Sequence, residues 1–164
     1  MSDTTTGSKM AEIKEQLDAV AAEARSTLAG LTAADMKRPS GNSGWTVGRV
    51  AAHLSATPKD VVRVTARVRK GRDFKVPAAP VVLNMINWWR GFQNRGKTGE
   101  QLAAQFDANY AVLCQELALC ADADWERTVK VSFQPEPLSL NNWWPATVDH
   151  IRGHVAEITQ APAA

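Results

Sequence analysis

The sequence predicts an all-α protein that folds as a four-helix bundle, with an irregular or short extended loop before the last helix. Three observations predict this class. Apolar residues recur at three- and four-residue steps over long segments, helix-capping patterns precede two of these segments, and the connections are short and irregular. A chain of 164 residues most economically forms one domain. We therefore expect residues 1–10 to be a disordered leader and residues 11–160 to form a single helical bundle domain.

The first two predicted helices each carry one apolar face. The first begins at Lys9 and ends near Gly30, and the second follows a breaker-rich stretch at residues 37–44. Thr46 can cap the second helix, and Pro58 should kink or divide it. The apolar positions of the two helices are Ile13, Leu17, Val20, Ala21, Ala24 and Leu28, then Val47, Val50, Ala51, Leu54 and Val61.

The second half of the chain contains four further predicted elements. Residues 81–93 are apolar enough for a buried helix. Thr98, followed three residues later by Gln101, matches the capping box and predicts a helix over the following residues. Residues 128–133 alternate between apolar and polar side chains and should be extended. Pro145 suits the first position of the last helix, because a helix needs no backbone donor there.

Composition and charge argue against several classes of function. The net charge of +2 is too small to indicate a nucleic-acid or membrane partner. No apolar run approaches the roughly 20 residues that cross a bilayer, and the first 16 residues lack the apolar centre of a secretory signal. The basic stretch at residues 63–72 is interpreted as a solvated helix end, since no aromatic residues are interleaved with it. We therefore expect a cytoplasmic protein with neither partner.

The three histidines of the chain form the strongest candidate site. His150 and His154 are four residues apart, so on a helix they differ by only about 40° in direction. His53 lies to the same side of the apolar face of its own helix as this pair does on the last helix. Three neutral imidazoles that leave positions open for water or substrate are a familiar way to bind zinc or nickel for catalysis. The alternative is that these are ordinary surface or core histidines.

Two segments resemble the DinB-like superfamily. They are GWTVGRVAAHL, which contains Trp45, Thr46, Val47, His53 and Leu54, and DHIRGHVAEI, which contains His150 and His154. The resemblance covers about residues 11–158. This superfamily includes bacterial thiol-dependent transferases and the N-terminal domain of mycothiol-dependent maleylpyruvate isomerases.

The resemblance implies a fold and a metal centre. The fold is a DinB-like bundle of up-down-down-up topology. The implied metal ligands are His53, His150 and His154, and the usual metal is zinc or nickel. The family's better understood members use a low-molecular-weight thiol such as mycothiol or bacillithiol, and members are often homodimers. A small-molecule substrate is therefore the expected partner.

The resemblance leaves the activity open between several functions. The first is a metal-dependent enzyme, a thiol-dependent S-transferase or an isomerase-like protein, with hydrolysis less expected. Maleylpyruvate isomerases carry an additional C-terminal domain and can use a carboxylate at the position of His150, so transfer is expected in preference to isomerisation. The alternatives are a non-catalytic metal- or small-ligand-binding bundle, and a structural dimer whose histidines bind nothing.

Four other residues are candidates for the same site. Glu157 lies nearly in line with His150, so it can orient a ligand imidazole or act as a catalytic base. Asn87 and Arg90 can bind a polar or anionic group of a substrate. Trp144, which precedes the histidine pair, is the preferred wall of a substrate pocket. The alternatives are solvated surface residues for the first three and core packing for the tryptophan.

Overall fold

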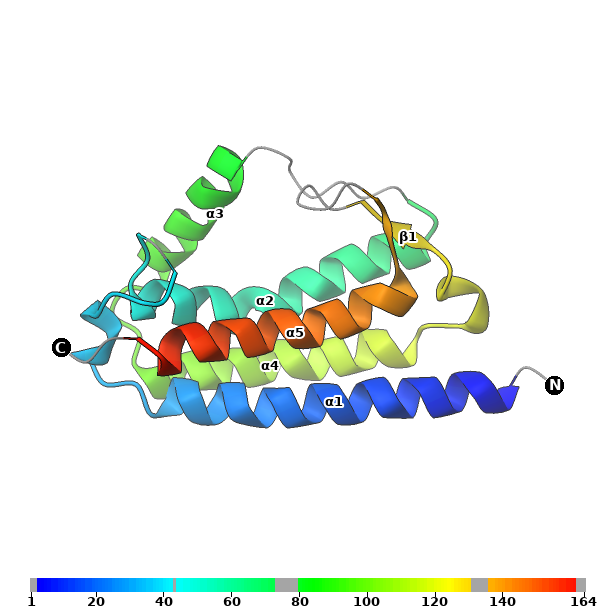
Figure 1. Ribbon diagram of the computed structural model, residues 1–164, viewed down its shortest axis with the longest axis horizontal. Coiled ribbons are helices and arrows are strands. Elements are labelled where there is room, and N and C mark those ends of the chain that lie inside the picture. Colours follow the sequence, from blue (N-terminus) through cyan, green and yellow to red (C-terminus); the bar gives the residue numbers. More distant parts are fainter. Residues whose placement is uncertain (1–2, 43, 73–79, 131–135, 162–164) are drawn as a thin grey trace.

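The computed structural model describes residues 3–42, 44–72, 80–130 and 136–161. Four long helices lie side by side in a bundle, and their directions follow the up-down-down-up order that the resemblance implies (Figure 1). They are α1 (Asp3–Ala29), α2 (Val47–Arg69), α4 (Gly99–Ala118) and α5 (Leu140–Thr159). A fifth helix, α3 (Pro80–Gln93), stands away from the bundle. The predicted all-α, four-helix-bundle class is confirmed.

Each bundle helix packs against two others, in the order α1, α4, α2, α5 and back to α1. Their apolar faces meet in one core, which includes the apolar positions expected for the first two helices. The largest fully buried side chains include Leu17, Leu54, Phe106, Leu113, Trp144 and Ile151. The packing of α2 against α5 is what brings residues almost 100 positions apart in sequence to one surface.

The two predicted helix caps are present. The side chain of Thr46 accepts a hydrogen bond from the backbone amide of Arg49 at 3.3 Å. Thr98 and Gln101 form the complete capping box, because Thr98 Oγ1 accepts from the Gln101 amide while Gln101 Oε1 accepts from the Thr98 amide. Each cap satisfies backbone donors that the first helical turn leaves without an intrahelical acceptor.

The first helix begins earlier than expected. Residues 3–10 are part of α1, where the sequence predicted a disordered leader. Near the expected start of the helix, side chains contact the rest of the protein. The ammonium group of Lys9 lies 5.4 Å from the centre of the Trp125 ring and donates to the side chain of Asn141, and Met10 packs against the core.

The last helix also begins earlier, at Leu140, so Pro145 lies inside α5 and is not its first residue. Hydrogen bonds to the segment that precedes β1 explain this earlier start of α5. The amides of Leu140 and Asn141 donate to the carbonyls of Arg127 and Trp125 at 2.9 and 3.1 Å, so their lack of an intrahelical acceptor has no cost. Pro58 likewise lies inside α2, which the structure assigns as one helix that the proline does not divide.

Two further elements precede the last helix. Strand β1 (Thr128–Val129) pairs antiparallel with β2 (Leu138–Ser139), which matches the start of the predicted extended segment. The rest of that segment, residues 131–133, lies outside the described residues. Short 3₁₀ helices occur at η1 (Asp35–Lys37) and η2 (Asp122–Asp124). Among the described residues, no helix combines the length and apolar character that crossing a bilayer requires.

Helix α3 is helical as predicted, but it is not buried. Val81, Met85, Trp88 and Trp89 each expose more than half of their surface. The reason is the position of the helix. Among the described elements it packs substantially only against α2, so most of its apolar face has no neighbour within the described residues. The ion pair between Arg90 and Asp60, with a 2.6 Å separation, fastens α3 to α2.

Candidate metal centre

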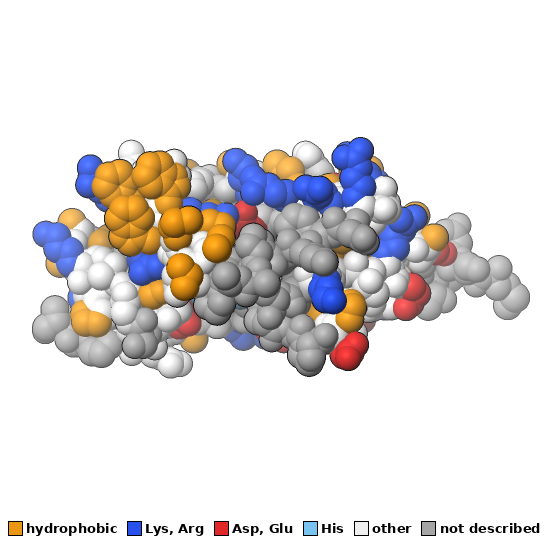
Figure 2. Space-filling model, turned by 90° about the horizontal axis from the view of Figure 1, so that it is seen from above, with side chains coloured by type: hydrophobic (Ala, Val, Ile, Leu, Met, Phe, Trp, Pro, Cys, Tyr) orange, Lys and Arg blue, Asp and Glu red, His pale blue; other side chains and the backbone are white. Residues whose placement is uncertain are grey.

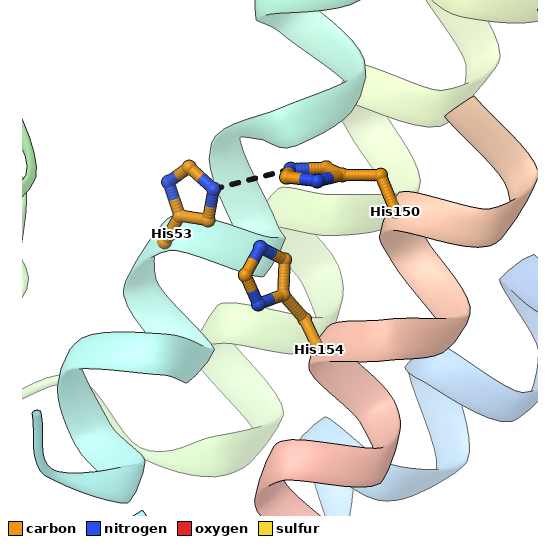
Figure 3. A group of neighbouring side chains, drawn as sticks. All are labelled: His53, His150 and His154. Carbon is orange, nitrogen blue, oxygen red and sulfur yellow. Dashed lines mark hydrogen bonds between the residues drawn. The ribbon is translucent and has the colours of Figure 1, made fainter. Parts of the chain in front are cut away.

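The three histidines meet where α2 and α5 pack together. His53 projects from α2, and His150 and His154 project from successive turns of α5 toward it (Figure 3). The ring centres of His53 and His154 are 4.7 Å apart, and those of His150 and His154 are 4.4 Å apart. One nitrogen from each ring can be chosen so that all three atoms lie within 4.8 Å of one another. The structure thus brings together the three residues that the sequence singled out.

Neighbouring side chains fix which nitrogen of two rings carries the proton. Nδ1 of His53 lies 3.1 Å from Oδ1 of Asn87, and Nδ1 of His154 lies 2.7 Å from Oε2 of Glu157. Both oxygens are acceptors, so each Nδ1 is the donor, and in the neutral form of each ring Nε2 is the nitrogen that carries the lone pair. The two rings therefore present their acceptor nitrogens to the interior of the group.

Among the described residues, the protein does not supply a hydrogen-bond donor to every Nε2 of the three histidines. Nε2 of His154 is buried and has no hydrogen-bond partner among the described residues. Nε2 of His53 faces Nε2 of His150 at 3.3 Å. A buried polar atom without a partner is costly and calls for an explanation. A cation at the centre of the three rings supplies one.

The donor set fits a divalent metal. Neutral imidazole nitrogens are preferred ligands of zinc and nickel. Zinc–nitrogen bonds are about 2.0–2.1 Å long, so two donors on one ion lie at most about 4.2 Å apart. The ring nitrogens lie within 4.8 Å of one another, a spread slightly wider than this limit. His154 is buried and His53 is partly buried, while His150 is exposed and forms the open side of the group.

The surroundings of His53 and His150 favour the neutral form of these two rings, which is the form that binds metals. Burial, reinforced by the nearby His154 and His150, lowers the pKa of His53 well below the usual value for histidine. The protein atoms packed around His150, together with His154, also lower the pKa of His150. Both rings therefore remain unprotonated at neutral pH, with a lone pair available for coordination.

Glu157 and Asn87 each contact one of the histidines. The sequence left Glu157 open between orienting a ring and acting as a base, and its carboxylate is engaged by His154. The backbone carbonyl of Glu157 also accepts from the amide of Gly41 at 3.2 Å, which ties the end of α5 to the loop before α2. Asn87, expected as a substrate-binding residue, instead reaches His53 from α3.

The other two candidates, Arg90 and Trp144, make their contacts away from the three histidines. Arg90 forms a two-point interaction with Asp60, at 2.6 and 2.8 Å, so its charge is already compensated. Trp144 is fully buried in the core, so the structure does not place it as a pocket wall. The adjacent Trp143 is partly buried, and its Nε1 donates a hydrogen bond to Oγ1 of Thr65. The alternative of core packing therefore describes Trp144.

Sequence reasoning missed one contact of the site and underused another. The hydrogen bond from His53 to Asn87 depends on how α3 returns toward α2, which no local pattern encodes. The ring of Trp45 meets that of His53 edge-on at 5.9 Å, and the guanidinium of Arg49 lies over the Trp45 ring at 4.1 Å. Trp45 belongs to the segment GWTVGRVAAHL, but it precedes α2, so its spacing from His53 did not indicate the contact.

Comparisons with known proteins agree with this fold. Residues 17–150 match the family described as the mycothiol maleylpyruvate isomerase N-terminal domain. Among curated proteins, none matches the sequence significantly. A crystal structure of the mycothiol-dependent maleylpyruvate isomerase is similar with a TM-score of 0.76 and 13% identity, covering 94% of this chain and 62% of that one. The chain thus spans about three fifths of the isomerase.

Two shorter proteins have the same fold. YfiT from Bacillus subtilis, described as a probable metal-dependent hydrolase with an unusual four-helix bundle topology, has a TM-score of 0.65 and 17% identity, covering 98% of this chain and 87% of YfiT. The colibactin self-resistance protein ClbS, solved in complex with double-stranded DNA, has a TM-score of 0.65 and 12% identity, covering 94% of this chain and 97% of ClbS. At these identities the structures establish the fold, and the match over residues 17–150 establishes the family. The chain belongs to the mycothiol maleylpyruvate isomerase N-terminal domain family, within the DinB-like superfamily.

Proposed function

We propose that the chain is a metal-dependent enzyme that joins a low-molecular-weight thiol to an electrophilic small molecule. The observation that carries this proposal is the convergence of three imidazoles, one of which has a buried Nε2 without a partner among the described residues. The family match and the mycothiol dependence of the similar isomerase support a thiol as co-substrate. Mycothiol and bacillithiol are the candidates we expect. We further propose that residues 11–160 act as one domain, as a cytoplasmic homodimer.

The proposed roles of the residues follow from their contacts. His53, His150 and His154 would hold zinc or nickel. The bound ion would supply an electrophilic centre that lowers the pKa of a coordinated thiol or water. Asn87 and Glu157 hold the rings of His53 and His154 by accepting from Nδ1, which fixes each Nε2 toward the centre. The exposed face of His150 marks the side from which thiol and substrate approach.

The proposed transfer is balanced without an external oxidant or reductant. The sulfur of the thiol loses its proton and forms a bond to an electrophilic carbon of the substrate, and that carbon's leaving group departs or its double bond takes up a proton.

A second candidate is a metal- or ligand-binding bundle without catalysis. One observation favours it: Glu157, the base candidate beside the histidines, is already hydrogen-bonded to His154. No free general base therefore stands beside the group among the described side chains that the sequence singled out. Metal binding is common to both candidates, and only an activity measurement separates them.

The test is metal analysis followed by a thiol-transfer assay. Protein purified without a histidine tag should contain about one zinc or nickel per chain. The metal-loaded protein should then consume a panel of alkylating electrophiles faster with mycothiol, bacillithiol or glutathione than the metal-stripped protein does. Metal binding without turnover on any thiol would support the binding protein and exclude the transferase.

Removing the acceptor of His154 should weaken metal binding. Glu157→Ala leaves Nδ1 of His154 without its carboxylate, so we expect a loss of about 10- to 100-fold in zinc affinity, measured by competition with a chelator. Glu157→Gln keeps an acceptor oxygen and should lose less. Asp149→Ala is the matched control, because Asp149 is an exposed carboxylate on the same helix whose partner is Arg152. Equal affinities of the Glu157→Ala and Asp149→Ala variants would contradict the orienting role.

A further inference from the structure

A second concave surface lies apart from the histidines. It is a groove of about 840 Å³, a volume typical of small-molecule sites. The end of α1, η1, the first turn of α2, the second half of α3 and the start of α4 surround it. None of the three histidines lines it. We call it the α3 groove.

Aromatic and aliphatic side chains form the walls of the α3 groove. Trp88 and Phe92 line it from α3, and Leu31 and Met36 line it from the opposite side. The rings of Trp88 and Phe92 are stacked, with centres 5.7 Å apart and planes inclined by 22°. Figure 2 shows hydrophobic side chains gathered over the position of α3, with Lys and Arg side chains beside them. Such walls favour a flat apolar body.

The charges of the α3 groove are strongly one-sided. Lys37, Arg49, Arg95 and Lys97 line it, while Glu100 is the one acidic residue among its lining residues. Within the part of the chain that the structure describes, none of these four cations forms an ion pair with a carboxylate. The guanidinium of Arg95 lies 3.9 Å from the centre of the Phe92 ring, which places a cation directly at the aromatic wall.

Arg49 is the most constrained of these cations. Its Nε is buried and has no hydrogen-bond partner among the described residues, although one terminal nitrogen donates to the carbonyl of Asn84 at 3.1 Å. The group lies over the Trp45 ring, and burial lowers the pKa of Arg49, which remains charged at neutral pH. A partly buried guanidinium without a carboxylate is costly, and an anion that enters the groove would offset this cost.

We propose that the α3 groove binds a small aromatic carboxylate, with the ring against Trp88 and Phe92 and the carboxylate against Arg49 and Arg95. A guanidinium presents paired donors that match a carboxylate, and the stacked rings match a flat body. None of the three histidines lines this ligand site, although Arg49 contacts Trp45, which in turn contacts His53. The site does not depend on the proposed thiol chemistry. A second copy of this chain fits the groove less well, because it would bring the same unpaired cations toward one another.

Three probes that share one ring and differ in charge test the proposal. They are 2-naphthoate, the neutral 2-naphthylmethanol and the cationic 2-naphthylmethylamine, each titrated calorimetrically into the full-length protein. The carboxylate should bind about tenfold or more tightly than the alcohol, and the amine should bind weakest. The preference for the carboxylate should shrink as salt is added. Equal affinities for all three probes would overturn the proposal.

Variants locate the binding. Arg95→Gln should weaken binding of naphthoate severalfold and leave binding of the alcohol unchanged, whereas Trp88→Ala should weaken both. Arg72→Gln removes the same charge from an exposed residue outside the groove and should change neither. If Arg95→Gln and Arg72→Gln have the same effect, the carboxylate is not bound in the groove.

The histidine site and a second copy of the chain are the two rivals for this binding, and each has its own measurement. A carboxylate can also bind a metal ion, so the titration is repeated with the His53→Ala variant. Unchanged affinity supports the α3 groove, and lost affinity assigns the carboxylate to the histidine site and overturns the proposal. Sedimentation of the wild type and of Trp88→Ala tests a second copy. The wild type could be a dimer that naphthoate does not dissociate but that the Trp88→Ala change converts to a monomer. This result would show that the face is an interface between chains and would overturn the proposal.

Discussion

Replacing His53 with alanine is expected to lower the zinc or nickel content of the purified protein from about one ion per chain to below about 0.2. His53 is the one ligand candidate on α2, and it faces both histidines of α5. Its loss leaves two imidazoles from adjacent turns of a single helix, and such a pair alone holds a divalent ion weakly. The measurement is elemental analysis of tag-free protein, before and after incubation with zinc or nickel and removal of the excess.

The control for this variant is Lys59→Ala, an exposed position further along the same helix. It should keep the wild-type metal content. Circular dichroism of both variants shows whether the bundle is intact, so that loss of metal is not confused with loss of fold. A His53→Ala protein that retains its metal would refute the three-histidine centre, and a wild type that takes up no metal under any loading condition would do the same.

Replacing Trp144 with alanine is expected to lower the free energy of unfolding by about 3–5 kcal/mol, the usual cost of removing a large aromatic side chain from a core. Trp144 is fully buried, so the change leaves a cavity between the helices that the surrounding side chains fill only in part. The measurement is chemical denaturation followed by circular dichroism, with the slope of the transition checked for constancy.

Trp89→Ala provides the comparison for the same chemical change. Trp89 is 51% exposed and stacks on Phe92, so its loss should cost less than about 1 kcal/mol. A large difference between the two variants would confirm that Trp144 belongs to the core. Similar small losses in both would return Trp144 to consideration as a residue of a binding surface.

Much of the bundle could be predicted from the sequence because its signals are local. The helical spacing of Leu17, Val20, Ala24 and Leu28 follows from the requirement that one face of α1 be buried, and all four are buried. The caps at Thr46 and Thr98 act within one turn, so their residues are neighbours in the sequence. The angular position of each histidine on its helix followed from the same helical periodicity, and the structure brings the three rings together.

The features that could not be predicted depend on contacts between distant segments. The direction of α3 is set by its packing on α2 and by the ion pair between Arg90 and Asp60. Its apolar composition therefore predicted a buried helix, whereas several of its large apolar side chains are exposed. The start of α5 depends on the carbonyls of Arg127 and Trp125, which meet the amides of Leu140 and Asn141 only in the folded chain. The contact of Asn87 with His53 requires α3 to be in place, so its role at the site was interpreted as substrate binding.

The two helices that supply the histidines have a consequence for the stability of the whole protein. His53 and His150 are 97 positions apart, so an ion held between them would link the second helix to the last one like a cross-link. Such a link can form only after the final helix has been synthesised and has docked. An ion at 100 times its dissociation constant would stabilise the folded chain by about 2.7 kcal/mol. Depletion of the metal would then increase unfolding and proteolysis, so the abundance of the protein would follow the metal supply.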